Sequence, residues 1–435
     1  MKRIAVVYDF GAVAPAEIAA SLRDIAEPVF VVPDNDHTRP LRRLLSRLGP
    51  CLWLVDGGPG DMRRIRAAGV DGVVTYSDAW LEFTAGAAAL LGSAGHDPQT
   101  ARRLTDKFEQ RSALARAGVE SIRFQELADA RDWPSLCERV GLPLVLKPRR
   151  GVASRDTHLV TDAEAARDLV ERLLHNGSRQ ESYIAEEYLL GHGTGPFGDF
   201  VSVESVIHRA RPRHIAVTGK FPLAAPFRET GHFWPAAVRP AAAEAIVALA
   251  DAAARALGVQ TGILHTEIKV TESGPRLIEV NGRLGGRIQA LSRAAGGPDL
   301  VAAAALLALG EDPSPPSVTA DGVVFAAITP APTDACTIAS LPDRRRVLAL
   351  PGVTQYTQFA RPGEHRAAGV CTSALDLIMG RVRDHAELVG TIERLRSQTS
   401  YGFTFAAGPA VSTGQDLVCV PRDTQAVPSA RRTPL

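Results

Sequence analysis

Residues 265–286 read HTEIKVTESGPRLIEVNGRLGG, and this stretch has the pattern of a β-hairpin. Turn-forming residues at 272–275 separate two runs in which apolar and polar residues alternate. Successive strand residues point to opposite faces, so Glu279, Asn281 and Arg283 are expected to share one face of the second strand. Pairing across the hairpin can bring Glu267 to the same face.

The polar residues of this hairpin predict a metal site. Two carboxylates and an amide oxygen (Glu267, Glu279 and Asn281) form an all-oxygen ligand set that suits Mg²⁺, with Mn²⁺ as the alternative ion. Arg283 beside them could supply a fork for a carboxylate or a phosphate. A solvent-facing strand with ordinary charges is the alternative, but LIEVNGR alternates apolar with polar residues, which favours the metal site.

The composition of the chain excludes several classes of protein. At 435 residues it is too long for one core, and 49 basic against 48 acidic side chains leave no excess for binding nucleic acid. The five cysteines are scattered, without metal spacing or a disulfide framework. The N-terminus lacks a signal-peptide pattern, and the alanine-rich run 300–309 is too short to span a membrane. We therefore expect a cytoplasmic protein with no nucleic-acid or membrane partner.

The first part of the chain alternates strand and helix patterns. Strand-like runs at residues 4–8, 28–32, 52–55 and 72–75, with helical patterns such as 16–26 and 41–48 between them, predict a parallel sheet covered on both faces. The loop after the first strand has one glycine, which argues against a dinucleotide site. A proline-rich linker is expected at 310–322, and a flexible tail at 404–435.

Two lysines and two loops are the remaining polar features. Lys107 lies on a basic helix expected from the sequence of residues 100–119, and Lys147 ends an apolar strand before Pro148. The loop RRGVASRD that follows Lys147 can offer backbone N–H groups and positive charge to phosphates. The segment FRETGHFWP contains Glu229 and His232 and suits recognition of a small polar ligand, although a plain surface loop is equally compatible with it.

The order of these elements resembles the ATP-grasp superfamily, from about residue 101 to residue 310. In detail it is similar to the carboxylate–amine ligases that include the bacterial L-amino acid ligases, or dipeptide synthetases. The resemblance implies an α/β and α+β fold: an N-terminal parallel α/β domain (1–95), an ATP-grasp domain (96–310) with a phosphate-loop lid subdomain at about 120–190, and a C-terminal mixed domain (311–403) before the tail.

The resemblance also implies roles for individual residues. Lys107 and Lys147 would contact the phosphates of ATP. The phosphate loop has only Gly151 where the family has several glycines, and side chains such as Ser154 could substitute. Other nucleotide contacts are implied for the hinge residues Glu186, Glu187, Tyr188 and Leu189, and for Asp199 as an acidic ribose ligand.

On the substrate side, the resemblance implies that Arg283 holds the substrate carboxylate and the charge that develops during transfer. Glu229 and His232 would line the amino-acid pocket, with Glu229 as a candidate general base. Arg287, four residues past Arg283, could favour an acidic side chain or a second carboxylate on the acyl donor, and a plain surface arginine is the alternative.

The expected activity is ATP-dependent ligation of a carboxylate to an amine through an acyl phosphate, releasing ADP and phosphate. Amino acids or a peptide are the expected substrates. Two alternatives are a biotin-carboxylase-like enzyme that activates bicarbonate and a nucleotide-binding module without turnover. Dimers are common among related ligases, but no feature of the sequence decides whether this chain forms a homodimer.

Overall fold

The computed structural model of the protein describes residues 1–175, 182–192, 195–314 and 321–418. The chain divides into two units: the first holds Met1–Ser121, Gly191–Lys220 and His232–Phe325, and the second holds Ile122–Leu190, Phe221–Gly231 and the chain from Ala326 onward. Four expected features lie partly or wholly outside the described residues: residues 176–181 of the lid subdomain, residues 315–320 of the linker, Cys419, and residues 419–435 of the tail. Every described helix is too short or too polar to cross a membrane.

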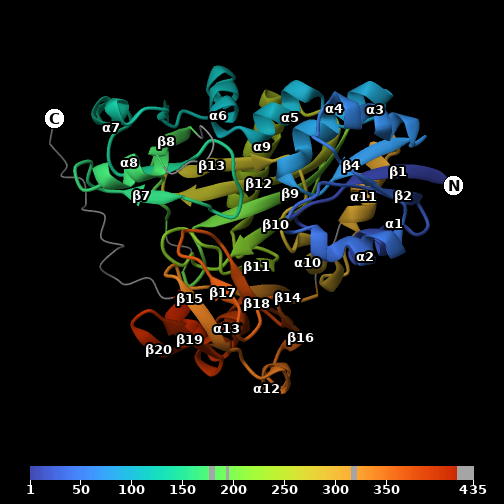
Figure 1. Ribbon diagram of the computed structural model, residues 1–435. Helices are drawn as coiled ribbons and strands as arrows, with labels where there is room; N and C mark the ends of the chain where they lie inside the picture. The colour runs from blue at the N-terminus through green and yellow to red at the C-terminus, as the bar shows by residue number, and fades with distance from the viewer. Residues whose placement is uncertain (176–181, 193–194, 315–320, 419–435) are drawn as a thin grey trace. The chain divides into compact units, whose positions relative to one another are not determined.

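The first unit begins with a four-stranded parallel sheet in the order β3-β2-β1-β4, which confirms the predicted parallel arrangement. Figure 1 shows α3 and α4 on one side of this sheet and α1 and α2 on the other. Side chains on both faces of β1, such as Val6 and Val7, are fully buried, as expected for a sheet covered twice. The elements are β1 (Lys2–Val7), α1 (Pro15–Leu22), β2 (Ala26–Val32), α2 (Arg42–Leu48), β3 (Cys51–Trp53), α3 (Pro59–Ala67), β4 (Gly72–Thr75) and α4 (Leu81–Leu91).

The same unit contains antiparallel strands in the order β13-β12-β9-β10-β11. One face of these strands is apolar: Val201, Val203, Leu264 and Ile268 pack in a core that also holds α9 residues such as Leu257. The elements are β9 (Phe200–His208), β10 (Arg211–Lys220), β11 (Gly231–Trp234), α9 (Pro240–Leu257), β12 (Gly262–Thr271), β13 (Gly274–Asn281), α10 (Ile288–Ala294) and α11 (Leu300–Ala308).

The basic stretch 100–119, expected as one helix, forms two: α5 (Pro98–Thr105) and α6 (Lys107–Arg116). The break is at Asp106, whose backbone is extended and whose side chain accepts hydrogen bonds from the N–H groups of Phe108 and Glu109. Aspartate is a strong N-cap, so it starts a new helix here. Lys107 consequently occupies the first position of α6 instead of the middle of a longer helix.

The second unit contains a four-stranded antiparallel sheet in the order β5-β8-β6-β7. Helices α7 and α8 contribute Trp133, Leu136 and Val170 to its core. The elements are β5 (Phe124–Leu127), α7 (Trp133–Val140), β6 (Leu144–Pro148), β7 (His158–Val160), α8 (Arg167–His175) and β8 (Tyr183–Glu187). This sheet occupies the range in which the lid subdomain is expected.

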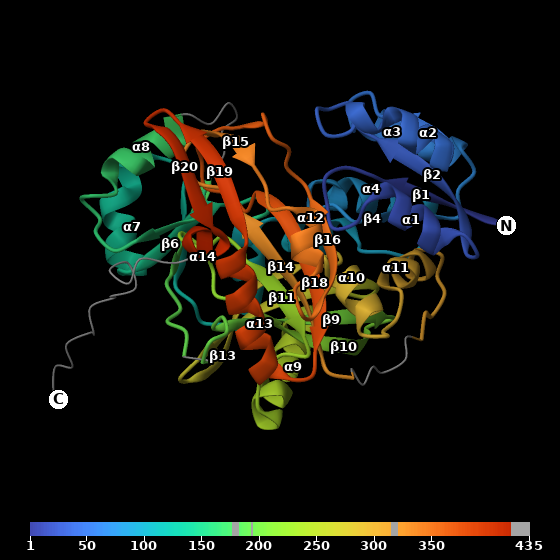
Figure 2. The same ribbon diagram turned by 90° about the horizontal axis from the view of Figure 1, so that it is seen from below.

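The C-terminal part of the second unit has strands in the order β14-β18-β16 and a small sheet in the order β17-β15-β19-β20. Figure 2 shows β19 and β20 running side by side above α13 and α14. The elements are β14 (Val323–Pro330), β15 (Cys336–Ser340), α12 (Arg344–Leu348), β16 (Val353–Gln358), β17 (His365–Arg366), β18 (Ala374–Val382), α13 (His385–Gln398), β19 (Ser400–Phe405), β20 (Gly408–Thr413) and α14 (Gly414–Val418).

The expectation that the whole of 404–435 is a flexible tail is wrong for its first part. β20 pairs with β19 along its full length, from Ser400 opposite Thr413 to Phe405 opposite Gly408. The composition of this stretch suggested disorder, but its backbone hydrogen bonds are made with a strand whose Phe403 side chain is fully buried. Pairing with a neighbouring strand therefore overrides a weak local pattern.

Candidate functional site

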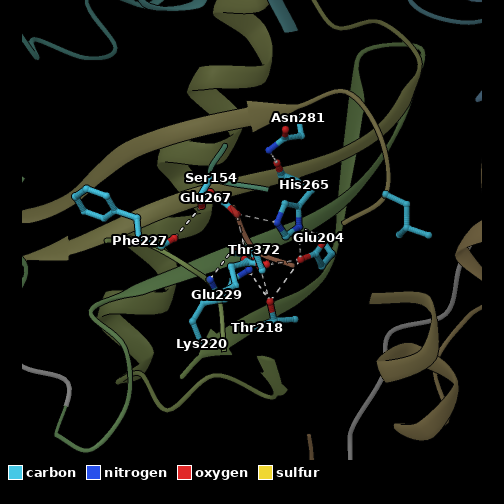
Figure 3. Close-up of polar contacts among 12 residues, drawn as sticks. Ser154, Glu204, Thr218, Lys220, Phe227, Glu229, His265, Glu267, Asn281 and Thr372 are labelled. Atoms are coloured by element: carbon cyan, nitrogen blue, oxygen red, sulfur yellow. Dashed lines mark hydrogen bonds and ion pairs between the residues drawn. The ribbon is translucent and has the colours of Figure 1, made fainter. Parts of the chain in front are cut away.

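The hairpin places its polar residues side by side. β12 and β13 pair antiparallel, with Glu267 directly opposite Glu279 and His265 opposite Asn281. The register shifts after Glu267, so that Ile268 faces Leu277 and the two carboxylates remain a cross-strand pair. The expectation that Glu267 joins the polar face of β13 is confirmed, because directly opposed residues point to the same face. Figure 3 shows Glu267, His265 and Asn281 together on this hairpin.

Arg283 is placed differently from the expectation. β13 ends at Asn281, so Arg283 does not continue its alternation. At Gly282 a Cβ atom would lie 2.7 Å from the end of the Leu81 side chain and 2.8 Å from the end of the Leu104 side chain, so glycine lets the chain pass close to both without displacing them. Arg283 follows this close approach, and its guanidinium contacts Asp78 instead of extending the polar face of the strand.

Each carboxylate of the hairpin faces a lysine. The Lys107 Nζ atom lies 3.1 Å from Glu279 Oε1, and the Lys220 Nζ atom lies 3.9 Å from Glu267 Oε1. A lysine at the first position of a helix meets the positive end of the helix dipole, which is unfavourable, so the position of Lys107 is explained by its carboxylate partner. Lys220 is only 1% exposed and was not predicted from the sequence.

A buried polar network lies behind Glu267. Nδ1 of His265 lies 2.8 Å from Glu204 Oε1, and its Nε2 lies 3.3 Å from Glu267 Oε1. Burial opposes the charged imidazolium, but the Glu204 carboxylate outweighs it and the pKa of His265 rises to about 9. Ser202 and Thr218 complete the network, with Ser202 donating to Glu204 at 2.9 Å. At neutral pH the protonated ring therefore donates to both carboxylates.

The sequence of β9 carries a signal for this network. In FVSVESVIH, Ser202 and Glu204 alternate with fully apolar Val201 and Val203, so one face of β9 carries polar groups into a buried position. Glu204 is 1% exposed and adjoins β12 in register, opposite His265. Burying a carboxylate without a charge partner costs much free energy, so a glutamate on a buried strand indicates a functional or structural network of charged groups.

The hairpin residues fit a hard divalent cation. The Asn281 amide nitrogen donates to the His265 carbonyl at 3.4 Å, so its carbonyl oxygen is the atom that remains for a ligand. With two carboxylates this makes three oxygen donors, and Mg²⁺ commonly takes its other ligands from phosphate and water. Among the described residues, no group of three or more histidine, cysteine, aspartate or glutamate side chains is placed to hold a metal. The set proposed from the sequence has only two such residues.

Arg283 is held by a carboxylate from the N-terminal sheet. Its Nε donates to Asp78 Oδ2 at 2.7 Å, its Nη2 lies 2.5 Å from the same oxygen, and its Nη1 donates to the Leu284 carbonyl at 3.0 Å. Burial opposes the charge, but Asp78 outweighs it and holds the pKa of Arg283 above its usual value. An arginine has five N–H groups, so two remain for a ligand beyond these three contacts with the described residues. Asp78 was not predicted.

Three further residues of the first unit have defined surroundings. Asp199, expected at the ribose, precedes β9 and receives a hydrogen bond from Lys269 Nζ at 2.7 Å. Arg287 is half-buried and has a left-handed backbone (φ 65°) at the start of α10, so it is not a plain surface arginine. His232 lies on β11 opposite Lys220 and is 1% exposed. Whether these residues contact ligands stays a prediction.

In the second unit, the expected phosphate lysine pairs with the expected hinge. Lys147 Nζ lies 2.8 Å from Glu186 Oε2, and both side chains are almost fully buried. In the hinge itself, the N–H of Glu187 donates to Arg123 and the N–H of Tyr188 donates to Pro143. Adenine recognition by the hinge backbone would therefore depend on its carbonyl groups and on Leu189.

The loop that was expected to bind phosphates has its tight backbone conformation at residues other than glycine. Ala153, Ser154 and Asp156 have φ values of 56°, 53° and 48°, a left-handed conformation that side chains disfavour. The Ser154 hydroxyl donates to the Phe227 carbonyl at 2.8 Å (Figure 3), so in this arrangement it is used within the fold. The backbone N–H of Glu229 donates to Thr372 Oγ1 at 3.1 Å. Thr372 was not predicted, and no local pattern marks it.

Comparison with known proteins agrees with this geometry. A sequence model described as ATP-grasp domain matches residues 140–290. The chain carries an ATP-grasp domain. The matched range contains the hairpin, Lys147 and the hinge, and the resemblance to ATP-grasp proteins inferred from the sequence is thereby confirmed.

Similar proteins and solved structures cover more of the chain. The alanine–anticapsin ligase of Bacillus subtilis is 28% identical over 295 residues, which span 64% of this chain and 60% of that protein. The crystal structure of an L-amino acid ligase from Bacillus licheniformis superposes with a TM-score of 0.76 at 20% identity, covering 92% of this chain and 98% of that one. A carboxyaminoimidazole ribonucleotide synthase from Aspergillus clavatus, complexed with ATP, gives a TM-score of 0.69 at 14% identity, covering 91% of this chain and 99% of that one.

Proposed function

We propose that this protein is an ATP-dependent ligase that joins a carboxylate to an amine, with an amino acid as at least one substrate. The observation that carries the proposal is the cross-strand pair of Glu267 and Glu279, flanked by Asn281, with Lys107 on one carboxylate. Relatives named as an alanine–anticapsin ligase and an L-amino acid ligase support the amino-acid substrate. The match to the first spans only about 60% of its length, so the activity is inferred for this chain.

In this proposal the hairpin holds the metal and the lysines hold the nucleotide. Glu267, Glu279 and Asn281 would bind Mg²⁺, or Mn²⁺ in its place. When bound there, the ion would supply positive charge to the phosphates of ATP. Lys107 and Lys147 would contact the phosphates, Glu186–Leu189 would border the adenine, and Asp199 would reach the ribose.

The chemistry needs ATP because a carboxylate is a poor electrophile in water. Transfer of the terminal phosphoryl group to the carboxylate gives an acyl phosphate and ADP; attack by the amine then forms the amide and releases phosphate. The enzyme contributes mainly positioning and charge. Arg283, with two N–H groups left after its contacts, would bind the substrate carboxylate and the charge that develops on it.

The amine would be recognised in the other loop. Glu229 would bind the substrate ammonium group and is the candidate acceptor of its proton, and His232 would line the same amino-acid pocket. Arg287 would act on the acyl donor, where a second cation favours an acidic side chain or a second carboxylate. The half-buried position of Arg287 supports this role more than that of a solvated surface residue.

Phosphate release from MgATP across a grid of paired amino acids and other carboxylates, with mass spectrometry of the products, tests the function. Release that needs two substrates and gives a product mass equal to their sum minus water would establish the ligase. Release that depends on bicarbonate instead would identify a biotin-carboxylase-like activity. ATP binding without release under any pair would refute the ligase and favour a binding module.

A further inference from the structure

Three segments of the second unit meet at the phosphate loop. The N–H of Thr372 donates to the Ala153 carbonyl at 2.7 Å, and the N–H of Asp156 donates to the Val370 carbonyl at 2.9 Å. These two backbone hydrogen bonds run in opposite directions between residues 153–156 and residues 370–372. The third segment, which contains Phe227, joins through the bond from the Ser154 hydroxyl to the Phe227 carbonyl.

The phosphate loop needs such support because of its backbone conformation. Its left-handed residues Ala153, Ser154 and Asp156 are not glycines, and Phe227 on the neighbouring segment also has a positive φ of 105°. Residues with a Cβ atom persist in such conformations only where the surrounding structure holds them. Residues 370–372 supply that hold through bonds to both ends of the strained stretch.

The part of the chain after residue 325 also makes hydrogen bonds with the segment that contains Glu229. The N–H of Glu229 donates to Thr372 Oγ1, the guanidinium of Arg228 donates to the Ala331 carbonyl, and Thr230 Oγ1 accepts from Arg396. Three successive residues are thus each bonded to a residue beyond 325. The backbone of Glu229 is held by its own N–H group, and the residues on either side of it are anchored through their side chains.

We propose that residues 370–372 are a positioning element, which we call the strap, and that it couples the conformation of the phosphate loop to the orientation of Glu229. The Thr372 residue makes both connections: its backbone N–H binds the phosphate loop, and its hydroxyl binds Glu229. The inference rests on the proposed function, in which Glu229 recognises the amine, and on the expectation that the loop after Lys147 offers N–H groups and positive charge to the phosphates of ATP. The strap then links binding of the nucleotide to recognition of the second substrate.

The test compares Thr372→Val, which removes the hydroxyl at nearly constant shape, with Thr372→Ser, which keeps it. We expect Thr372→Val to speed hydrogen exchange in a peptide covering residues 152–157, and trypsin cleavage after Arg155, by about threefold. The KM for the amine substrate should rise about tenfold, because the N–H of Glu229 loses its partner, while the KM for ATP changes less than about twofold. Thr372→Ser should restore all three values.

Ser373→Ala is the matched control. Its hydroxyl lies one residue from the strap and receives a hydrogen bond from Arg366 at 3.1 Å, away from Glu229. It should leave exchange in residues 152–157 unchanged. If Thr372→Val lowers the melting temperature strongly, Ser154→Ala provides the second variant: it cuts the bond to Phe227 and should speed exchange at Glu229 and in 369–374.

Exchange and proteolysis need no turnover, so they test the strap even if no substrate pair releases phosphate. Unchanged exchange in residues 152–157 for Thr372→Val, or equal behaviour of the Val and Ser variants, would overturn the positioning role. A wild-type enzyme that ligates amino acids while Thr372→Val has an unchanged KM for the amine would also overturn it, and would leave the proposed function standing.

Discussion

Arg283 gives the sharpest test of the proposed chemistry, because its ion pair with Asp78 and its proposed catalytic role can be separated. Replacing Arg283 with Met removes the charge proposed to stabilise the reacting carboxylate and leaves Asp78 without its cation. Loss of one well-placed electrostatic donor lowers kcat by about 10²–10³-fold. Asp78 is 15% exposed as a side chain, so an unpaired carboxylate there costs somewhat less than the about 3–5 kcal/mol of a fully buried pair.

The double variant Arg283→Met with Asp78→Asn separates the two effects. Asparagine carries no charge, so the unfolding free energy should recover by about 2 kcal/mol relative to Arg283→Met alone. Turnover should not recover, because the donor to the substrate is still absent. Thermal unfolding and phosphate release with the best substrate pair are the two assays, run on the same preparations.

Arg276→Met is the control on the same hairpin. Its guanidinium lies 2.7 Å from Glu120, so its loss also leaves a carboxylate without its cation. This variant should lose stability and keep kcat within about threefold, because no reacting group lies there. The reasoning would be refuted if the double variant regained wild-type turnover, or if Arg276→Met reduced kcat as much as Arg283→Met.

Three further predictions follow from the same structure. Lys107→Met should raise the KM for ATP by about 10–100-fold through loss of a charge-assisted contact, and an unchanged KM in phosphate-release assays would contradict its role. Lys220→Met removes the cation facing Glu267, so the nucleotide-free variant should bind Mn²⁺ about fivefold more tightly than wild type. Electron paramagnetic resonance measures this binding, and equal or weaker binding would contradict the metal site. Burial raises the pKa of Asp376 above its usual value despite hydrogen bonds from Tyr401 and Tyr356. Protonated Asp376 therefore stabilises the fold. This contribution to the free energy of unfolding is complete below the unfolded-state pKa and is lost as the pH rises through the folded-state pKa. Asp376→Asn should accordingly raise the free energy of unfolding more at pH 8 than at pH 5 in denaturant titrations, and an equal or larger gain at pH 5 would contradict the assignment.

Local periodicity predicted the polar hairpin and the parallel sheet. In β12 and β13 the alternation of side chains is a property of each strand, so the pairing of Glu267 with Glu279 could be anticipated from residues 265–286. In the N-terminal sheet, apolar runs separated by helical patterns were sufficient to predict parallel strands. Both predictions rest on patterns that lie within single strands and helices.

The partners of these residues were not visible in the sequence, because they come from distant parts of the chain. Asp78 is 205 residues away from the Arg283 that it orients, and Glu204 is 61 residues from His265. Asp106 caps α6, so Lys107 lies at the start of a helix. Pairing with β19 gives a strand structure to β20, which was expected to be flexible. Strand periodicity shows which face a side chain takes. Charge compensation in a buried site depends on which other strands lie against that face, and only the tertiary structure decides that.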